Sequence, residues 1–192
     1  LSQVEKEIEK LQKELLDCNQ ERKKEIESQI KKQEEYYQHL SPYDHVYLAR
    51  KSTRPNIKDY INHLFDDFIE LHGDRSFGDD IGILCGIAKL NNKSVAVIGQ
   101  MSGDNINENI KYNFSMTLPH GFRKAIKLIK LANKLNLPVI MFVDTIGADP
   151  TQNSEEHGQA YLIAECIKQS LICKSLTISV CINDGNSVGA LA

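Results

Sequence analysis

Residues 81–98 read IGILCGIAKLNNKSVAVI, and this stretch decides the fold class. Its two halves, 81–90 and 94–98, are short, apolar and rich in β-branched residues, which favours strands over helix. Asn91-Asn92 separates the halves, and asparagine is one of the few residues that accept the backbone angles of a tight hairpin turn. The stretch therefore predicts a hairpin of two antiparallel strands.

Beyond this hairpin the apolar pattern alternates between the helical period and the strand period. Such alternation indicates an α/β fold with a mostly parallel sheet and flanking helices, in which the loops that follow the strands carry the chemistry. The predicted order is a polar loop over 100–113, a helix over 121–135, a strand over 138–143, a helix over 154–170, a strand over 176–182 and a helix that begins after 188.

The chain that precedes residue 41 is charged and helical in pattern. Apolar residues at positions 1, 4, 8, 11, 15 and 18 form the narrow stripe of an amphipathic helix, and a second row resumes at Ile26 and Ile30. This pattern predicts a helical hairpin over 1–40. The hairpin either docks on another subunit or packs on itself as a cap, and the sequence leaves both open.

Residues 41–192 are expected to form the main domain. Ser41-Pro42 suits a helix start, because serine can cap the helix and proline is tolerated at its first position. After the break at Arg54-Pro55, apolar residues at helical spacing predict a second helix over 57–71, which ends near Gly73.

Composition narrows the class of function. The 192 residues are 41% apolar, enough for one buried core with an accessory element, and their net charge of -3 gives no footprint for nucleic acid or an anionic membrane. We expect a cytoplasmic protein with reduced thiols and no metal of its own, because the cysteines lack paired metal-ligand spacing. Apolar neighbours in the sequence predict that most of the cysteines are buried. The five are Cys18, Cys85, Cys166, Cys173 and Cys181.

Polar, glycine-bearing loops follow the predicted strands, over 99–112, 144–148 and 183–190. A turn from strand into helix exposes backbone N–H groups that suit an oxyanion or a phosphate, although such turns are also common structural connections. The chain has no P-loop, no G-x-S-x-G elbow and no histidine pair at metal-ligand spacing. Asp66-Asp67 and Asp79-Asp80 are interpreted as solvated or capping residues.

Several strings in one order resemble the alpha subunit of the bacterial and plastid acetyl-CoA carboxylase carboxyltransferase, a crotonase-superfamily family, over nearly the whole chain. These strings are Arg54-Pro55, DYI at 59–61, FDDFIELHGDR at 65–75, VIGQ at 97–100, ENI at 108–110, Asn113-Phe114, Met116, Gly121, Arg123-Lys124-Ala125, Asp144-Thr145, Gly147-Ala148, Glu155-Glu156, Gly158-Gln159 and GNSVGAL at 185–191.

The resemblance implies a crotonase-like (ClpP/crotonase) fold and transfer of a carboxyl group from carboxybiotin to acetyl-CoA, which gives malonyl-CoA for fatty acid biosynthesis. Carboxybiotin would arrive on the biotin carboxyl carrier protein. The expected partner is a carboxyltransferase beta subunit that carries zinc, in an alpha2beta2 heterotetramer. No protein base is required in the family, because biotin can itself accept the proton from the acetyl methyl group.

The resemblance also implies the site residues. A backbone oxyanion loop falls at Gly185, Asn186, Ser187 and Gly189, and substrate-binding positions fall at Gly147, Ala148, Gly121 and Arg123. Arg123 could face a carboxylate or phosphate of an acyl-CoA, or could form an ordinary ion pair.

Departures from the family pattern concentrate in the loops, at Ser102, Asp104, Ile146, Asp149, Thr151, Asn183, Asn186 and Val188. A β-branched Val188 would block the loop if that position needs positive φ or close ligand approach. The family continues beyond the position of Ala192, so the chain is expected to be a fragment or to be completed by another chain. Alternative functions are a catalytically degenerate assembly subunit and a related acyl-CoA carboxyltransferase or decarboxylase subunit.

Overall fold

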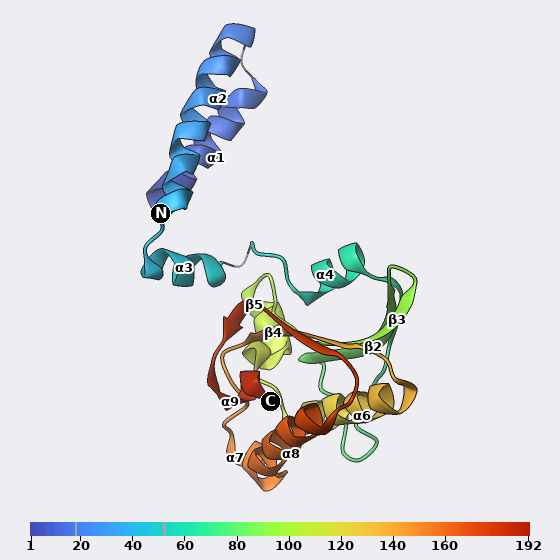
Figure 1. The fold of residues 1–192 in the computed structure, drawn as a ribbon. Coiled ribbons are helices and arrows are strands. Elements are labelled where there is room, and N and C mark those ends of the chain that lie inside the picture. Colours follow the sequence, from blue (N-terminus) through green and yellow to red (C-terminus); the bar gives the residue numbers. More distant parts are fainter. Residues whose placement is uncertain (18, 52) are drawn as a thin grey trace. The chain divides into compact units, whose positions relative to one another are not determined.

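The structure, a computed structural model, describes residues 1–17, 19–51 and 53–192 (Figure 1). The chain forms two compact units, Leu1–Ala49 and Arg50–Ala192. The prediction for Cys18 lies outside the described residues. The first unit includes the helix that follows Ser41-Pro42, whereas the sequence pattern placed the domain boundary after residue 40.

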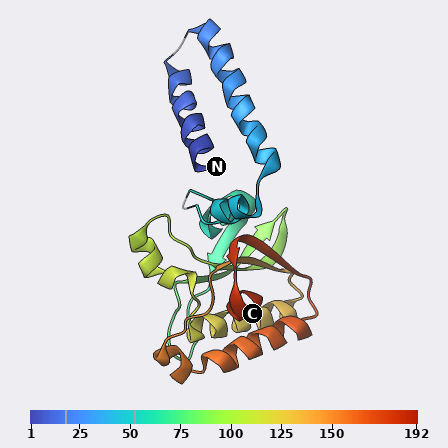
Figure 2. The same cartoon turned by 90° about the vertical axis from the view of Figure 1, so that its left-hand side faces the viewer.

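The first unit is a helical hairpin followed by two short helices. Its elements are α1 (Ser2–Leu16), α2 (Gln20–Glu34), the 3-10 helix η1 (Glu35–His39) and α3 (Pro42–Ala49). Figure 2 shows α1 and α2 side by side and antiparallel, which confirms the predicted hairpin. Its described residues include the buried Ile8 and Ile26, and polar contacts between the helices include Gln33 Nε2 to Glu7 Oε2 at 3.0 Å.

The second unit is built on a five-stranded sheet in which spatial order follows chain order. Its strands are β1 (Asp66–Glu70), β2 (Ile83–Leu90), β3 (Lys93–Gln100), β4 (Val139–Thr145) and β5 (Thr177–Gly185). β1–β2 and β2–β3 are antiparallel, whereas β3–β4 and β4–β5 are parallel. Asn91 and Asn92 both have positive φ, at 50° and 62°, so the predicted hairpin and its turn are confirmed.

Helices cover both faces of this sheet. They are α4 (Ile57–Leu64), α5 (Ile106–Lys111), the 3-10 turn η2 (Asn113–Ser115), α6 (Pro119–Leu135), α7 (Gln152–Glu156), α8 (Gln159–Ile172) and α9 (Ser187–Leu191). Figure 1 shows α6 and α8 together on one face and α4 on the other. One apolar core lies between the sheet and α6 and α8, around Phe122 and Leu128, and the second packs around Ile57.

The predicted helix over 57–71 was wrong in its second half. The helix ends at Leu64, Phe65 is extended (φ -122°, ψ 144°), and residues Asp66–Glu70 form β1. Backbone pairing of Ile69 with Ile87 on β2 explains the change, because hydrogen bonds to a distant strand outweighed a local helical period.

Other boundaries also differ from the sequence pattern, and the main differences are three. The polar loop over 100–113 contains α5, and the helix over 154–170 is divided into α7 and α8 at Gly158, whose φ of +82° interrupts a right-handed helix. β5 continues to Gly185, three residues farther than predicted, because Thr145 on β4 pairs with it.

The described cysteines differ in burial. Cys85 and Cys166 are buried, and burial raises the pKa of each thiol to about 12. Cys181 is exposed, so its predicted burial was wrong. It lies on β5, an edge strand of the sheet, which leaves it open to solvent. Among residues 1–17, 19–51 and 53–192, no helix has both the length and the apolar character needed to span a membrane.

Candidate functional site

The candidate site lies where β3, β4 and β5 end, because parallel neighbours bring their carboxyl ends to one edge of the sheet. Thr145 of β4 pairs with Gly185 of β5, so the β4 loop (residues 145–149) and the β5 loop (residues 185–189) begin side by side. The segment after β3 joins them through a bridge between Thr117 and Ala148. The loop over 99–112 lies beside them as well, because the Ser102 hydroxyl donates to Asp144 Oδ2 at 2.6 Å, so all three loops singled out in the sequence are neighbours.

The β4 loop is fixed by the side chain of Thr145, which is only 1% exposed. Its Oγ1 lies 2.5 Å from the carbonyl oxygen of Ser115 and 2.7 Å from that of Gly147, and it accepts the N–H of Gly147 at 3.0 Å. The hydroxyl thus ties the turn at Gly147 (φ 153°) to the segment after β3. Thr145 was not among the predicted site residues, although its string was part of the resemblance.

The β5 loop packs its backbone against the β4 loop. The N–H of Asn186 donates to the carbonyl of Thr145 at 3.1 Å. A Cβ atom on Gly189 would lie 2.5 Å from the amide nitrogen of Ala148, so only glycine permits this approach. Ser187, the first residue of α9, is left-handed (φ 69°), whereas Val188 has no positive φ and is 53% exposed. A positive φ at Val188, one condition for blockage, is therefore not present.

A left-handed turn supports the same site from the β3 side. Asn113, Phe114 and Ser115 have φ of 51°, 52° and 62°, and such runs of non-glycine residues are costly. Asn113 Nδ2 donates to Asp149 Oδ1 at 3.0 Å, and Ser115 Oγ donates to the Met101 carbonyl at 2.9 Å. These bonds hold the strained turn in place, and no sequence pattern signalled it.

Asp149 is a buried anchor of the β4 loop. Burial acts to raise its pKa, but hydrogen bonds from Ser154, Thr151 and Asn113 outweigh burial and lower the pKa below its ordinary value. Gln159, 1% exposed, donates through Nε2 to the carbonyls of Thr117 and Asp149 at 2.8 and 3.0 Å. Asp149 therefore remains charged and fixes the end of this loop.

Gly121 and Arg123 lie at the start of α6, beside these loops. A Cβ on Gly121 would lie 2.2 Å from Asp80 Oδ2 and 2.8 Å from Thr117 Cγ2, so this turn is closely packed. Arg123 Nη1 lies 3.3 Å from Asp74 Oδ2, and Nη2 donates to the His157 carbonyl at 2.8 Å. The ion pair left open by the sequence is present, and a role for Arg123 toward substrate stays a prediction.

Carboxylates that precede β2 organise the start of α6. Asp80 accepts the Leu118 N–H at 2.9 Å, and burial raises the pKa of its carboxyl group. Lys124, 1% exposed, donates to Asp79 Oδ1 at 2.8 Å and to the Ile83 carbonyl at 2.9 Å. The capping interpretation of the aspartate pair holds for Asp80, whereas Asp79 pairs with a buried lysine that sequence reasoning missed.

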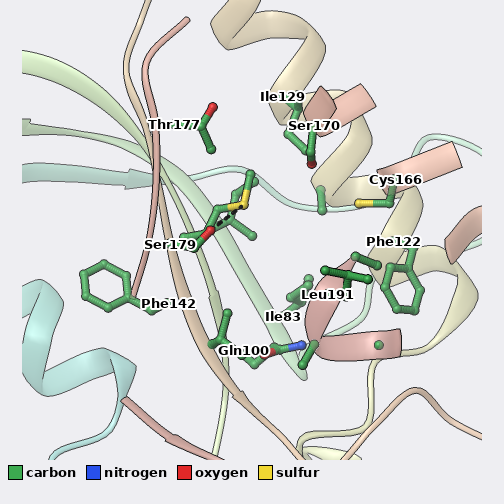
Figure 3. A pocket seen from close by; sticks show the side chains of 17 residues that line it. Ile83, Gln100, Phe122, Ile129, Phe142, Cys166, Ser170, Thr177, Ser179 and Leu191 are labelled. Atoms are coloured by element: carbon green, nitrogen blue, oxygen red, sulfur yellow. Dashed lines mark hydrogen bonds between the residues drawn. The ribbon is translucent and has the colours of Figure 1, made fainter. Parts of the chain in front are cut away.

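A cavity of about 120 Å³ lies behind α9, between the sheet and the helices α6 and α8. Figure 3 shows Phe122 and Cys166 on the helical side of this cavity and Thr177 and Ser179 on the side of β5. Its lining is mostly apolar, and the buried Oγ of Ser170 has no hydrogen-bond partner among the described residues.

The sequence is similar to a known protein family. A family model described as acetyl co-enzyme A carboxylase carboxyltransferase-like matches residues 1–192. A Pelagibacter ubique acetyl-coenzyme A carboxylase carboxyl transferase subunit alpha is 45% identical over 90% of this chain and 46% of its own length, and a Clostridium perfringens protein of that name is 53% identical over 77% and 54%. The chain thus spans about half the length of the curated relatives it matches.

Solved structures support the fold. The beta subunit of P. aeruginosa geranyl-CoA carboxylase superposes with a TM-score of 0.60 at 17% identity, over 77% of this chain and 26% of that chain. A single-chain, multi-domain long-chain acyl-CoA carboxylase gives 0.62 at 16% identity, over 77% and 14%. The predicted α/β class and crotonase-like fold are confirmed.

Proposed function

This chain belongs to the acetyl-CoA carboxylase carboxyltransferase-like family, and from that premise we propose that it transfers a carboxyl group from carboxybiotin to acetyl-CoA as part of an alpha-type subunit. A beta-type subunit would hold much of the acyl-CoA, and a biotin carboxyl carrier protein would deliver the carboxyl group. The product would be malonyl-CoA. The transferase activity and the alpha-type role extend to this chain what its longer relatives are named for.

The backbone contact between the β4 and β5 loops carries the proposal. The first N–H groups of a helix have no acceptor within the helix, so those of Ser187, Val188 and Gly189 at the start of α9 can point to a bound oxygen. The N–H groups of Asn186 and Gly147 already bind Thr145, so they hold the loops rather than the substrate. One oxyanion-hole donor contributes about 3 kcal/mol to lowering a barrier.

The residues present fit a ureido oxygen. The loops meet where a Cβ on Gly189 would collide with Ala148, and Gly185, Ser187 and Val188 are exposed beside that contact. Carboxybiotin, when bound, would supply the carboxyl group, and the N–H groups of the β5 loop would orient its ureido oxygen. Arg123, at the start of α6, pairs with Asp74, whose carboxylate accepts the N–H groups of Ser76 and Gly78. We therefore assign Arg123 to holding the loop over 74–78.

The test is the reverse reaction, carboxylation of free biotin that depends on malonyl-CoA, with this chain and a matching beta subunit. We expect turnover that requires both proteins and saturates with either one. Turnover at the background of each protein alone, with folding confirmed by circular dichroism, would refute the proposal.

A substitution at Val188 distinguishes an active subunit from a catalytically degenerate assembly subunit. Its half-exposed side chain stands among the proposed donors, so Val188→Gly should leave turnover unchanged or increase it. A stable complex with the beta subunit that stays inactive in both the wild type and Val188→Gly would instead identify a catalytically degenerate assembly subunit.

A further inference from the structure

We infer that Asp144 and Asn183 are positioning residues that set the place of the β5 loop, an inference that rests on the proposed function. The register between β4 and β5 shifts just before this loop: Val143 pairs with Cys181, and the next pair is Thr145 with Gly185. Asp144 alone therefore lies opposite the three residues 182–184, which form a bulge in β5. A bulge bends a strand and changes the direction of its end, so the side chains that bind this bulge determine the position of the loop that follows.

Asp144 holds the bulge from the inside. It is 5% exposed, and its Oδ2 accepts the Asn183 Nδ2 group at 2.9 Å and the Ser102 hydroxyl at 2.6 Å. Its own N–H donates to Gln100 Oε1 at 3.0 Å. One carboxylate thus joins the ends of β3, β4 and β5, the three strands whose loops make the site.

Two arginines hold the same bulge from the outside. Arg54 Nε donates to Asn183 Oδ1 at 2.6 Å, and its Nη2 donates to the Ile182 carbonyl at 2.8 Å. Arg50 Nε lies 3.3 Å from Asp184 Oδ2. Asn183 is therefore bound on both sides of its amide, and its orientation is fixed because the oxygen faces a cation and the NH2 group faces a carboxylate.

This arrangement gives two sequence departures a common role. Ser102 and Asn183 were both expected from the sequence to depart from the family pattern, and both bind Asp144 Oδ2. Loss of the Asn183 amide would leave Asp144 and Arg54 without their shared partner, free the bulge and displace the N–H groups that follow. The groups act through the loop, so the predicted defect is in turnover rather than in substrate affinity.

Asn183→Ala is the first test, with Ser179→Ala on the same strand as control, because Ser179 is exposed and its hydroxyl contacts only the Met141 sulfur at 3.9 Å in the described structure. Displacement of donors by about 1 Å lowers turnover about 100-fold. We expect that loss in kcat with KM unchanged, and faster amide exchange over 185–189, for Asn183→Ala alone. Unchanged kcat and unchanged exchange would overturn the inference.

Asp144→Asn distinguishes positioning from proton transfer. The amide oxygen of asparagine can take the place of Oδ2 and accept both hydrogen bonds, so positioning predicts that most activity remains, whereas Asp144→Ala should match Asn183→Ala. Abolished turnover in Asp144→Asn with unchanged exchange would show that the carboxylate moves a proton and would overturn the inference. If the wild type shows no transfer at all, the proposed function fails, and the exchange measurement still decides whether Asn183 holds the loop.

Discussion

Gly189→Ala should separate the β4 and β5 loops. The added Cβ would lie 2.5 Å from the Ala148 nitrogen and 2.8 Å from the Gly147 carbonyl carbon, and both neighbours are backbone atoms that cannot rotate away. An ordinary contact begins at 3.4 Å, so the loops must part by about 0.9 Å. Crowding of this kind in a packed region costs about 1 to 3 kcal/mol of unfolding free energy.

Gly78→Ala is the matched control, because a Cβ at Gly78 meets nothing within 4 Å. Urea unfolding of the two variants measures the difference, and amide exchange over 145–149 and 185–189 locates it. We expect a lower midpoint and faster exchange in both loops for Gly189→Ala only. Equal midpoints and unchanged exchange in the two variants would refute the close contact between these loops.

Three other predictions concern the scaffold. Asp74 has a pKa of about 2, because hydrogen bonds from backbone N–H groups and Arg123 outweigh its burial, which acts to raise the pKa. The charged carboxylate should stabilise the fold by about 2 kcal/mol above pH 4, and this contribution should be lost as pH falls from about 4 to 2. Urea unfolding at pH 5 and pH 2.5 measures the loss. Lys124→Met should lower the unfolding free energy by about 3 kcal/mol, because it leaves a carboxylate and buried carbonyls without their donor; a change under about 1 kcal/mol in thermal or urea unfolding would contradict the network. A maleimide at pH 7 should label Cys181 in the native protein and spare Cys166, and mass spectrometry that finds Cys166 labelled first would contradict the assigned burial.

Local chemistry accounts for the parts of the fold that could be predicted. Asn91-Asn92 favours its own turn, and the buried face of α6 repeats at helical spacing, so both elements follow from neighbours in sequence. Residues 66–70 could not be assigned in this way, because their strand exists through pairing with β2. The apolar spacing there fits a helix equally well.

The candidate site also has parts that the sequence pattern could locate and parts that it could not. Glycine-bearing loops after strands could be located from the pattern, and the structure brings Gly147, Ala148 and Gly189 into contact. The bonds of Asn183 with Asp144 and Arg54 could not be predicted, because they depend on a bulge that exists only when β5 pairs with β4. The sequence marked Asn183 as a departure, and the three-dimensional contacts give that departure a reason.

Amide exchange on the complex with the beta subunit, with and without saturating biotin, tests the central claim most directly. If the β5 loop binds the ureido oxygen, biotin should slow exchange at Ser187–Gly189 and leave α1 and α2 of the hairpin unchanged. Protection confined to other segments, in a complex that still carboxylates biotin, would contradict the assignment of these loops as the site.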